Sequence, residues 1–225
     1  QRQKARESGR FKRDDSELDW SSVSEGEDSR FLGYESLDVR ALVRRYAPSN
    51  GQTMVILDQT PFYAESGGQV GDTGRIEGTG VDLDVIDVQK DGDSFVHICT
   101  GTLDPDALGS GEVKCVVDGA RRGHTRRNHT ATHLLHAAVK QVLGDQVQQA
   151  GSFVDPDHLR FDLTYFEKIT PDKVTEIEKI ASSIAVLKDG KKVYDETMET
   201  FIKSANDDGQ EIEDAFFAFY DKELK

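Results

Sequence analysis

Cysteine is scarce in this 225-residue sequence, which contains only Cys99 and Cys115. Two thiols are too few for the disulfide framework of a small secreted domain, and they fit a reducing compartment. Apolar residues make up 36% of the chain, and no apolar run approaches the roughly 20 residues that span a bilayer. The chain also does not open with a secretory signal. These absences predict a cytoplasmic protein without a membrane span.

Basic residues are outnumbered, with 28 Lys and Arg against 42 Asp and Glu and a net charge of −14. Such a surface repels nucleic acid as a whole, so DNA is not an expected partner, although a polyanion can dock on a local basic patch. One candidate patch contains four arginines and no acid, between Ala120 and Arg127. Its arginines are Arg121, Arg122, Arg126 and Arg127. The length is sufficient for one large or two modest domains with a real core.

A histidine-rich stretch follows, reading Arg-Arg-Asn-His-Thr-Ala-Thr-His-Leu-Leu-His from 126 to 136. As a helix it places His129 and His133 one turn apart, where both imidazoles can share a divalent cation. The alternative is polar or half-buried helix residues beside an apolar stripe. That stripe would contain Leu134, Leu135, Ala138, Val139, Val142 and Leu143. His136 is a possible third ligand, but a position behind the metal ligands or in the core is favoured. Metalloprotease chemistry is excluded, because Thr130 stands where the general-base Glu should follow the first histidine.

Between Phe31 and Val117, short runs with β-branched residues and glycine punctuation predict strands. The predicted strands are Thr53 to Leu57, Val81 to Val88, Ser94 to Thr100 and Glu112 to Val117. Their hairpin-like spacing predicts a small β-barrel or sheet. Alternation puts His97 and Cys99 on one strand face, as ligands or, preferably, as ordinary strand residues.

Two further segments have weaker patterns. Residues 1–35 are charged and serine-containing, which predicts the end of a helix, within Gln1 to Ser8, and then an extended linker. Trp20 and Phe31 are candidates for fastening that linker to a neighbour. Apolar spacing predicts a helix from Pro171 to Leu187, with Thr170 as its N-cap, followed by a turn at 188–192.

A glycine-rich loop reads Phe-Tyr-Ala-Glu-Ser-Gly-Gly-Gln-Val-Gly-Asp from Phe62 to Asp72. Its glycines allow positive φ angles and close approach of the backbone to a ligand. A tight surface loop between strands is the plainer interpretation. The loop matches neither the phosphate-binding P-loop nor the dinucleotide-binding fingerprint.

This loop and the histidine stretch, together with Gln149-Ala150-Gly151-Ser152 and Leu159-Arg160-Phe161-Asp162, resemble the editing region of alanyl-tRNA synthetase. The resemblance extends from about Phe11 to about Pro171 and includes free-standing editing proteins that hydrolyse mischarged seryl- or glycyl-tRNA(Ala). It implies an α+β fold in three parts. These are a charged helix end and linker at 1–35, a translation-factor-like, β-barrel-like subdomain at 36–120, and an α/β editing core with a histidine-bearing helix at 121–225.

The resemblance also implies a zinc cofactor, held by His129, His133 and a Cys-x-x-x-His pair. That pair is absent here, because no histidine follows His158 and no cysteine follows Cys115. One hypothesis is a fragment that ends before the second ligand pair; the other is a divergent protein that has lost zinc. The function implied is an aminoacyl-tRNA deacylase acting as part of a parent synthetase chain. A catalytically inert tRNA-binding module is the alternative.

Individual roles follow from the resemblance and from the chemistry of an already activated ester, which needs a positioned water and a place for oxyanion charge. The expected catalytic residues are Gln149 and Thr130. The expected substrate contacts are Ser66, Gln69, Thr132, Arg126 and Arg127. Serine differs from alanine by a hydroxyl, which a hydrogen-bonding pocket can detect. The four arginines would face the phosphates of the tRNA(Ala) acceptor end or, equally, form a solvated turn. Arg160 is expected to form a structural ion pair with Asp162 or a neighbouring residue.

Overall fold

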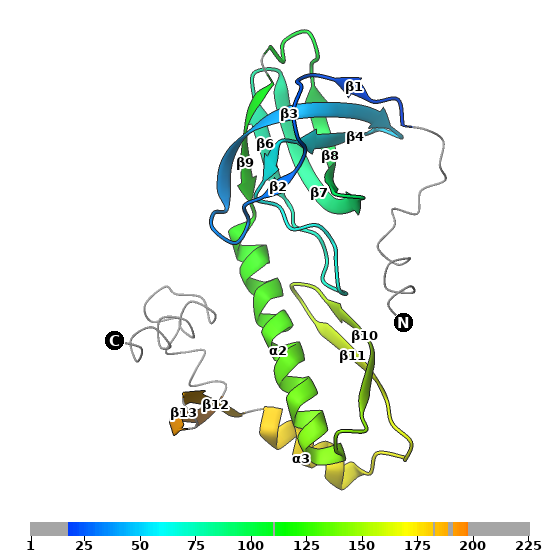
Figure 1. The fold of residues 1–225 in the computed structure, drawn as a ribbon, viewed down its shortest axis with the longest axis vertical. Helices are drawn as coiled ribbons and strands as arrows, with labels where there is room; N and C mark the ends of the chain where they lie inside the picture. The colour runs from blue at the N-terminus through cyan, green and yellow to red at the C-terminus, as the bar shows by residue number, and fades with distance from the viewer. Residues whose placement is uncertain (1–17, 110, 182, 189–190, 198–225) are drawn as a thin grey trace. The chain divides into compact units, whose positions relative to one another are not determined.

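The structure, a computed structural model, describes residues 18–109, 111–181, 183–188 and 191–197. The chain divides into two compact units, the first ending at Arg122 and the second beginning at Gly123 (Figure 1). Both helices and strands are present, so the α+β class is confirmed. Within the described part of the chain, no helix is both long enough and apolar enough to cross a lipid bilayer.

Six antiparallel strands of the first unit close into a barrel (Figure 1). Around the barrel they run in the order β3 (Asp38–Ser49), β4 (Gln52–Leu57), β8 (Ser94–Leu103), β7 (Val81–Asp91), β6 (Gly74–Gly78) and β9 (Glu112–Val117). Closure depends on β3, because residues 38–42 pair with β9 and residues 43–49 pair with β4. A closed barrel leaves no unpaired edge among these strands.

The four predicted strands correspond to β4, β7, β8 and β9, so the prediction of a barrel is confirmed. Alternation is clear in β7, where Val81, Leu83 and Val85 are buried while Asp82 and Asp84 are exposed. The interior cluster contains residues such as Val55, Leu57, Phe62, Ile76 and Leu83. Full burial of each large side chain stabilises the fold by about 1.5–3 kcal/mol.

A second apolar cluster covers the opposite face of β3, β4 and β8. It contains Ala47, Met54, Ile56, Val96 and Ile98, with Leu18 and Trp20 packed against it. Strand β4 is therefore buried on both faces, since Met54 and Ile56 lie in this cluster while Val55 and Leu57 lie inside the barrel. Trp20 also lies under the Arg45 guanidinium, 5.6 Å from the ring centroid.

The segment before β3, expected as a linker, lies along the barrel and is hydrogen-bonded to it. Strand β1 (Ser21–Ser22) pairs antiparallel with β3, and β2 (Arg30–Phe31) pairs parallel with β5 (Gln59–Thr60). The Arg44 side chain donates to the Ser24 hydroxyl and to the backbone carbonyls of Glu25 and Glu27. Phe31 stacks on Phe95 with 5.7 Å between centroids, so anchoring by Trp20 and Phe31 is confirmed.

Helix α2 (Gly119–Leu143) leads into the second unit, which also contains a β-hairpin and a shorter helix. The hairpin strands are β10 (Gln148–Val154) and β11 (Leu159–Thr164), and the shorter helix is α3 (Pro171–Ala181). A third apolar cluster contains Ala138, Val139, Leu143, Val147 and Ile177. The predicted stripe of α2 thus packs toward α3, as an amphipathic helix should.

The end of α3 corrects one prediction. The helix begins at Pro171 as predicted but stops at Ala181, and β12 (Ser183–Lys188) pairs antiparallel with β13 (Lys191–Thr197). The predicted helix up to Leu187 is therefore wrong. Its last residues form a continuous apolar run, which periodicity alone cannot assign to helix or strand. The centre of the predicted turn at 189–190 and the helix end at Gln1 to Ser8 lie outside the described residues.

Candidate functional site

His129 and His133 lie one turn apart on α2, and both side chains are exposed. Their Nε2 atoms are 3.0 Å apart, and the ring planes are inclined by 30°. Two nitrogens that bind one tetrahedral zinc ion lie about 3.3 Å apart, since each Zn–N bond is about 2.0–2.1 Å. The spacing fits a shared cation, and it also fits a hydrogen bond from one neutral imidazole to the other.

The histidine pair supplies only two metal donors. Among the residues that the structure describes, no group of three or more His, Cys, Asp or Glu side chains could hold a metal ion. His136 packs against Phe161 of β11 with 5.1 Å between ring centroids, and its Nε2 is buried without a hydrogen-bond partner. Its surroundings are those of a core residue rather than those of a third ligand. The residues present therefore fit half of a tetrahedral zinc site.

The predicted polar residues of the second unit differ in exposure. Thr132 is 7% exposed, and its hydroxyl donates to the Asn128 carbonyl at 2.8 Å. Its oxygen can still accept a hydrogen bond, but its proton is already engaged. Thr130 is half-buried on the same helix, and Gln149 is exposed on β10 opposite Leu163.

A set of side-chain hydrogen bonds joins α2 to the turn of the β10–β11 hairpin, and no sequence pattern indicated it. The Asn128 amide donates to the Asp155 carbonyl at 2.8 Å. The Asp155 carboxylate accepts from the backbone amides of Asp157 and His158, both at 2.8 Å. On β11, the predicted Arg160–Asp162 ion pair is present at 3.2 Å and is exposed.

The glycine-rich loop of the first unit ends in a two-residue turn. Backbone hydrogen bonds run both ways between Ser66 and Gln69, at 3.1 and 3.0 Å. Gly67 and Gly68 have φ angles of 60° and 88°, which the tight turn requires and which glycine adopts without strain. Ser66 is exposed, whereas Gln69 is 7% exposed. We call residues 66–69 the glycine turn.

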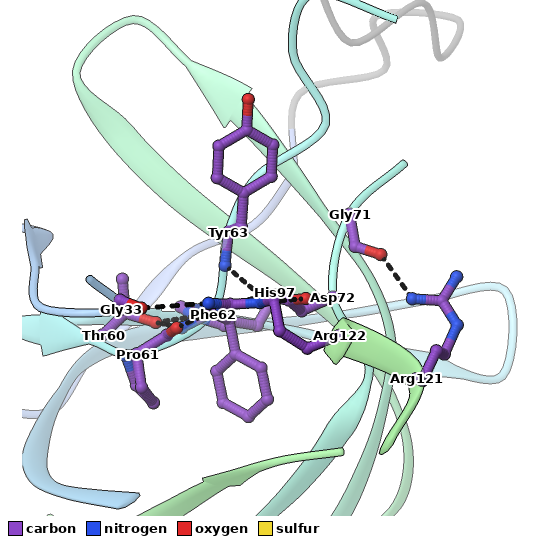
Figure 2. A network of polar contacts seen from close by, with 10 residues as sticks. All are labelled: Gly33, Thr60, Pro61, Phe62, Tyr63, Gly71, Asp72, His97, Arg121 and Arg122. Atoms are coloured by element: carbon purple, nitrogen blue, oxygen red, sulfur yellow. Dashed lines mark hydrogen bonds and ion pairs between the residues drawn. The ribbon is translucent and has the colours of Figure 1, made fainter. Parts of the chain in front are cut away.

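The base of this loop is held by a buried ion pair between Arg122 and Asp72 (Figure 2). The Arg122 Nε donates to Asp72 Oδ1 at 2.8 Å, and an Nη contacts the other carboxylate oxygen. Two further Nη protons reach the carbonyls of Gly33 and Pro61, both at 2.9 Å. The Tyr63 backbone amide donates to Asp72 Oδ2 at 2.6 Å. One guanidinium therefore joins three separate segments of the barrel unit.

This ion pair corrects the expectation for Arg122. Arg122 is 6% exposed and donates to Asp72, Gly33 and Pro61 within the barrel unit, so its expected role toward phosphates is wrong. Arg121 donates to the Gly71 carbonyl at 2.8 Å. Arg126 and Arg127 are half-buried on α2. The sequence shows only the charge of an arginine, whereas buried carbonyls and a carboxylate can take up its donors.

Tyr63 lies beside the base of the loop and points away from Phe62 (Figure 2). Phe62 is fully buried in the barrel, while the Tyr63 ring packs edge-on against Phe31 at 6.2 Å. The Tyr63 hydroxyl donates to the Ser66 carbonyl at 3.4 Å. Partial burial raises the pKa of Tyr63 above its usual value, so the phenol remains a neutral donor at physiological pH.

Comparison with known proteins identifies relatives of this chain. A family model described as tRNA synthetases class II (A) matches residues 1–121. The alanine--tRNA ligase of Chlorobium phaeovibrioides is 42% identical over 194 residues, which is 80% of this chain and 22% of the relative. That of Chlorobaculum tepidum is 40% identical over 206 residues, 84% of this chain and 23% of the relative. The alanine--tRNA ligase of Xanthomonas axonopodis pv. citri is 44% identical over 180 residues, which is 75% of this chain and 20% of the relative. The chain thus spans less than a quarter of the length of these relatives.

Proposed function

The chain belongs to the class II (A) tRNA synthetase family, its relatives are alanine--tRNA ligases, and on that premise we propose that it edits mischarged tRNA(Ala). The proposed reaction is hydrolysis of the ester in seryl- or glycyl-tRNA(Ala). The observation that carries the proposal is the exposed pair of convergent imidazoles on α2, His129 and His133, with their nitrogens 3.0 Å apart.

The proposed chemistry needs little beyond positioning, because the ester is already activated. His129 and His133 would hold zinc, which would supply Lewis acidity when bound. The Gln149 amide can donate a hydrogen bond to the oxygen on which negative charge develops. The proposed partners are the acceptor end of tRNA(Ala) and the remainder of a parent synthetase.

Discrimination would depend on the hydroxyl that serine has and alanine lacks. A site that hydrogen-bonds this hydroxyl rejects the analogue without it far better than an apolar pocket separates methylenes. Since the Thr132 proton is engaged by Asn128, Thr132 could only accept from the substrate hydroxyl. Thr130, Ser66 and Gln69 are the other proposed contacts.

The first test measures deacylation of seryl-tRNA(Ala) and alanyl-tRNA(Ala) by the purified chain, with and without zinc. We expect loss of serine but not of alanine. His133→Ala should reduce the serine rate by about 100-fold or more and leave tRNA affinity nearly unchanged. The matched control is His124→Ala, which replaces an exposed histidine of the same helix and should retain the rate of serine deacylation. Equal hydrolysis by wild type and His133→Ala would contradict the assigned role of the pair.

A catalytically inert tRNA-binding module is the second candidate, and the two-donor metal set favours it. In that case the wild-type chain binds tRNA(Ala) but hydrolyses neither ester at any zinc concentration. A longer chain of the same protein would then be the decisive comparison. Deacylation of seryl-tRNA(Ala) by the longer chain would mean that editing requires residues outside the present sequence.

Either candidate predicts that Arg126 and Arg127 contribute to tRNA affinity. Replacing both with alanine should weaken binding and reduce the slope of log affinity against log salt by about 0.7–0.9 for each phosphate that the arginines neutralise. Arg160→Ala is the control, because Arg160 is exposed but paired with Asp162. A double variant with an unchanged salt slope would assign both arginines to the fold instead. Filter binding across a range of salt concentrations provides the measurement.

A further inference from the structure

We propose that the Arg122–Asp72 pair is a positioning pair for the reaction, which sets the pose of the glycine turn. The inference rests on the proposed function, in which Ser66 and Gln69 contact the substrate. Neither Arg122 nor Asp72 would touch the substrate, because both are buried, at 6% and 3% exposure. Their effect would pass through the loop whose base they hold.

The loop from Tyr63 to Asp72 is closed by two hydrogen bonds between its first and last residues, and the Asp72 carboxylate takes part in one of them. The Tyr63 amide donates to the Asp72 carboxylate, and the Asp72 amide donates to the Tyr63 carbonyl at 3.0 Å. Two residues on each side, 64–65 and 70–71, then lead to the glycine turn. A shift of the Asp72 side chain would therefore reach the turn through only these short connecting segments.

Two further contacts hold the loop against strand β7. The Glu65 amide donates to the Val88 carbonyl at 2.8 Å. On the other side, a Cβ on Gly71 would lie 2.5 Å from Asp87 Oδ1 and 2.8 Å from the Val88 backbone, so only glycine allows this approach. The Gly71 carbonyl accepts from Arg121. The backbone before and after the turn is thus fixed, while the exposed Ser66 at its start faces solvent.

Stability alone is a weak reason for this arrangement. A buried ion pair is often no more stabilising than apolar side chains of similar volume, because both charges must be desolvated. Its advantage is geometric, since the planar guanidinium donates in fixed directions to Asp72, Gly33 and Pro61 at once. Placement of a substrate-contacting turn within a fraction of an ångström is a use that fits this geometry.

Arg122→Lys tests the proposal because it keeps the positive charge and removes the planar guanidinium with its several donors. Lysine presents its donors from one point and cannot reach two carbonyls and both carboxylate oxygens together. We expect amide hydrogen exchange at residues 64–71 to quicken about tenfold at a temperature where the barrel remains folded. In the same sample the serine-to-alanine ratio of deacylation rates should fall about tenfold or more, through kcat rather than KM.

The matched control is Arg40→Lys, which alters an exposed arginine of the same barrel that pairs with Glu112. It should leave both the exchange and the rate ratio unchanged. If Arg122→Lys does not fold, the isosteric Asp72→Asn provides the same test, because its amide NH₂ would face the Arg122 donors. The proposal would be overturned by a variant that has a lower melting temperature but keeps the amide exchange rates and the serine-to-alanine rate ratio of the wild type.

The two readouts separate this inference from the function on which it rests. Wild-type protein that hydrolyses neither ester contradicts the proposed function for this chain and removes the catalytic consequence of the pair here. A second outcome is that the wild type is active and that Arg122→Lys shows faster amide exchange in the loop but an unchanged serine-to-alanine rate ratio. This outcome supports the function and overturns the positioning role. Faster exchange together with a lower ratio supports both.

Discussion

Replacing Arg122 with methionine should lower the free energy of unfolding of the barrel by about 3–5 kcal/mol at neutral pH, the usual range when one partner of a buried ion pair is removed. The carboxylate of Asp72 would stay buried with only the Tyr63 amide as a donor. The carbonyls of Gly33 and Pro61 would lose the guanidinium protons that they now accept. A methionine side chain fills the space but satisfies none of these groups.

Urea unfolding followed by tryptophan fluorescence provides the measurement. Trp20 is the single tryptophan and packs on the outer apolar cluster of the barrel, so its signal reports on this unit. The midpoint should fall with little change in the slope m, which indicates a change in stability rather than in the surface exposed.

Arg40→Met is the matched control for this experiment. The Arg40 side chain is 79% exposed, and its ion pair with Glu112 is open to solvent. Its loss should cost less than about 1 kcal/mol. Similar losses in the Arg122 and Arg40 variants would contradict the structural role of the buried pair. The double variant Asp72→Leu with Arg122→Met should recover part of the loss, since it removes the unpaired charge.

A strand was easy to predict where a few consecutive residues carry a clear alternation of apolar and polar side chains. Strand β7 shows strict alternation from Val81 to Val85, because one face points into the barrel and the other into solvent. Strand β6, by contrast, has a single buried side chain, Ile76, between the exposed Arg75 and Glu77, so it shows no alternation over several residues. Strand β3 went unpredicted although it closes the barrel, since Arg44, Arg45 and Pro48 obscure its alternation and its two halves have different partners.

The candidate site divides in the same way. The spacing of His129 and His133 is a local property of one helix, and the convergence of their rings could be predicted from it. The ion pair of Arg122 joins positions 33, 61, 72 and 122, and nothing in the sequence distinguishes Arg122 from Arg121 beside it. Only the folded barrel decides which of the two arginines is enclosed. Contacts of such long sequence separation leave no periodic signal.

Acid should destabilise the barrel through His97, a fully buried residue of β8. Its Nδ1 donates to the Val55 carbonyl at 2.9 Å, so its Nε2 is the acceptor for the Thr60 hydroxyl at 2.7 Å. The Thr60 oxygen in turn accepts from the Phe62 amide at 3.1 Å. A protonated His97 would place two donors against each other at the Thr60 hydroxyl and would charge the barrel interior.

Burial lowers the pKa of His97 from the ordinary 6.5 to about 4. Between these values the unfolded chain binds a proton that the folded chain does not, so stability falls as the pH falls. The stabilisation from neutral His97 is complete above about pH 6.5, and about 3 kcal/mol of it should be lost by about pH 4. Urea unfolding with the Trp20 signal at several pH values in this window measures the loss.

Because carboxylates also titrate near the lower end of the window, the histidine contribution requires a difference between proteins. His97→Gln keeps a donor and an acceptor but does not titrate, so its stability should fall less steeply between about pH 6.5 and about pH 4 than that of wild type. His124→Gln removes an exposed histidine and should retain the wild-type slope. Equal slopes for wild type and His97→Gln would mean that the buried imidazole already takes up its proton in the folded barrel. In that event the hydrogen-bond directions through Thr60 would have to reverse.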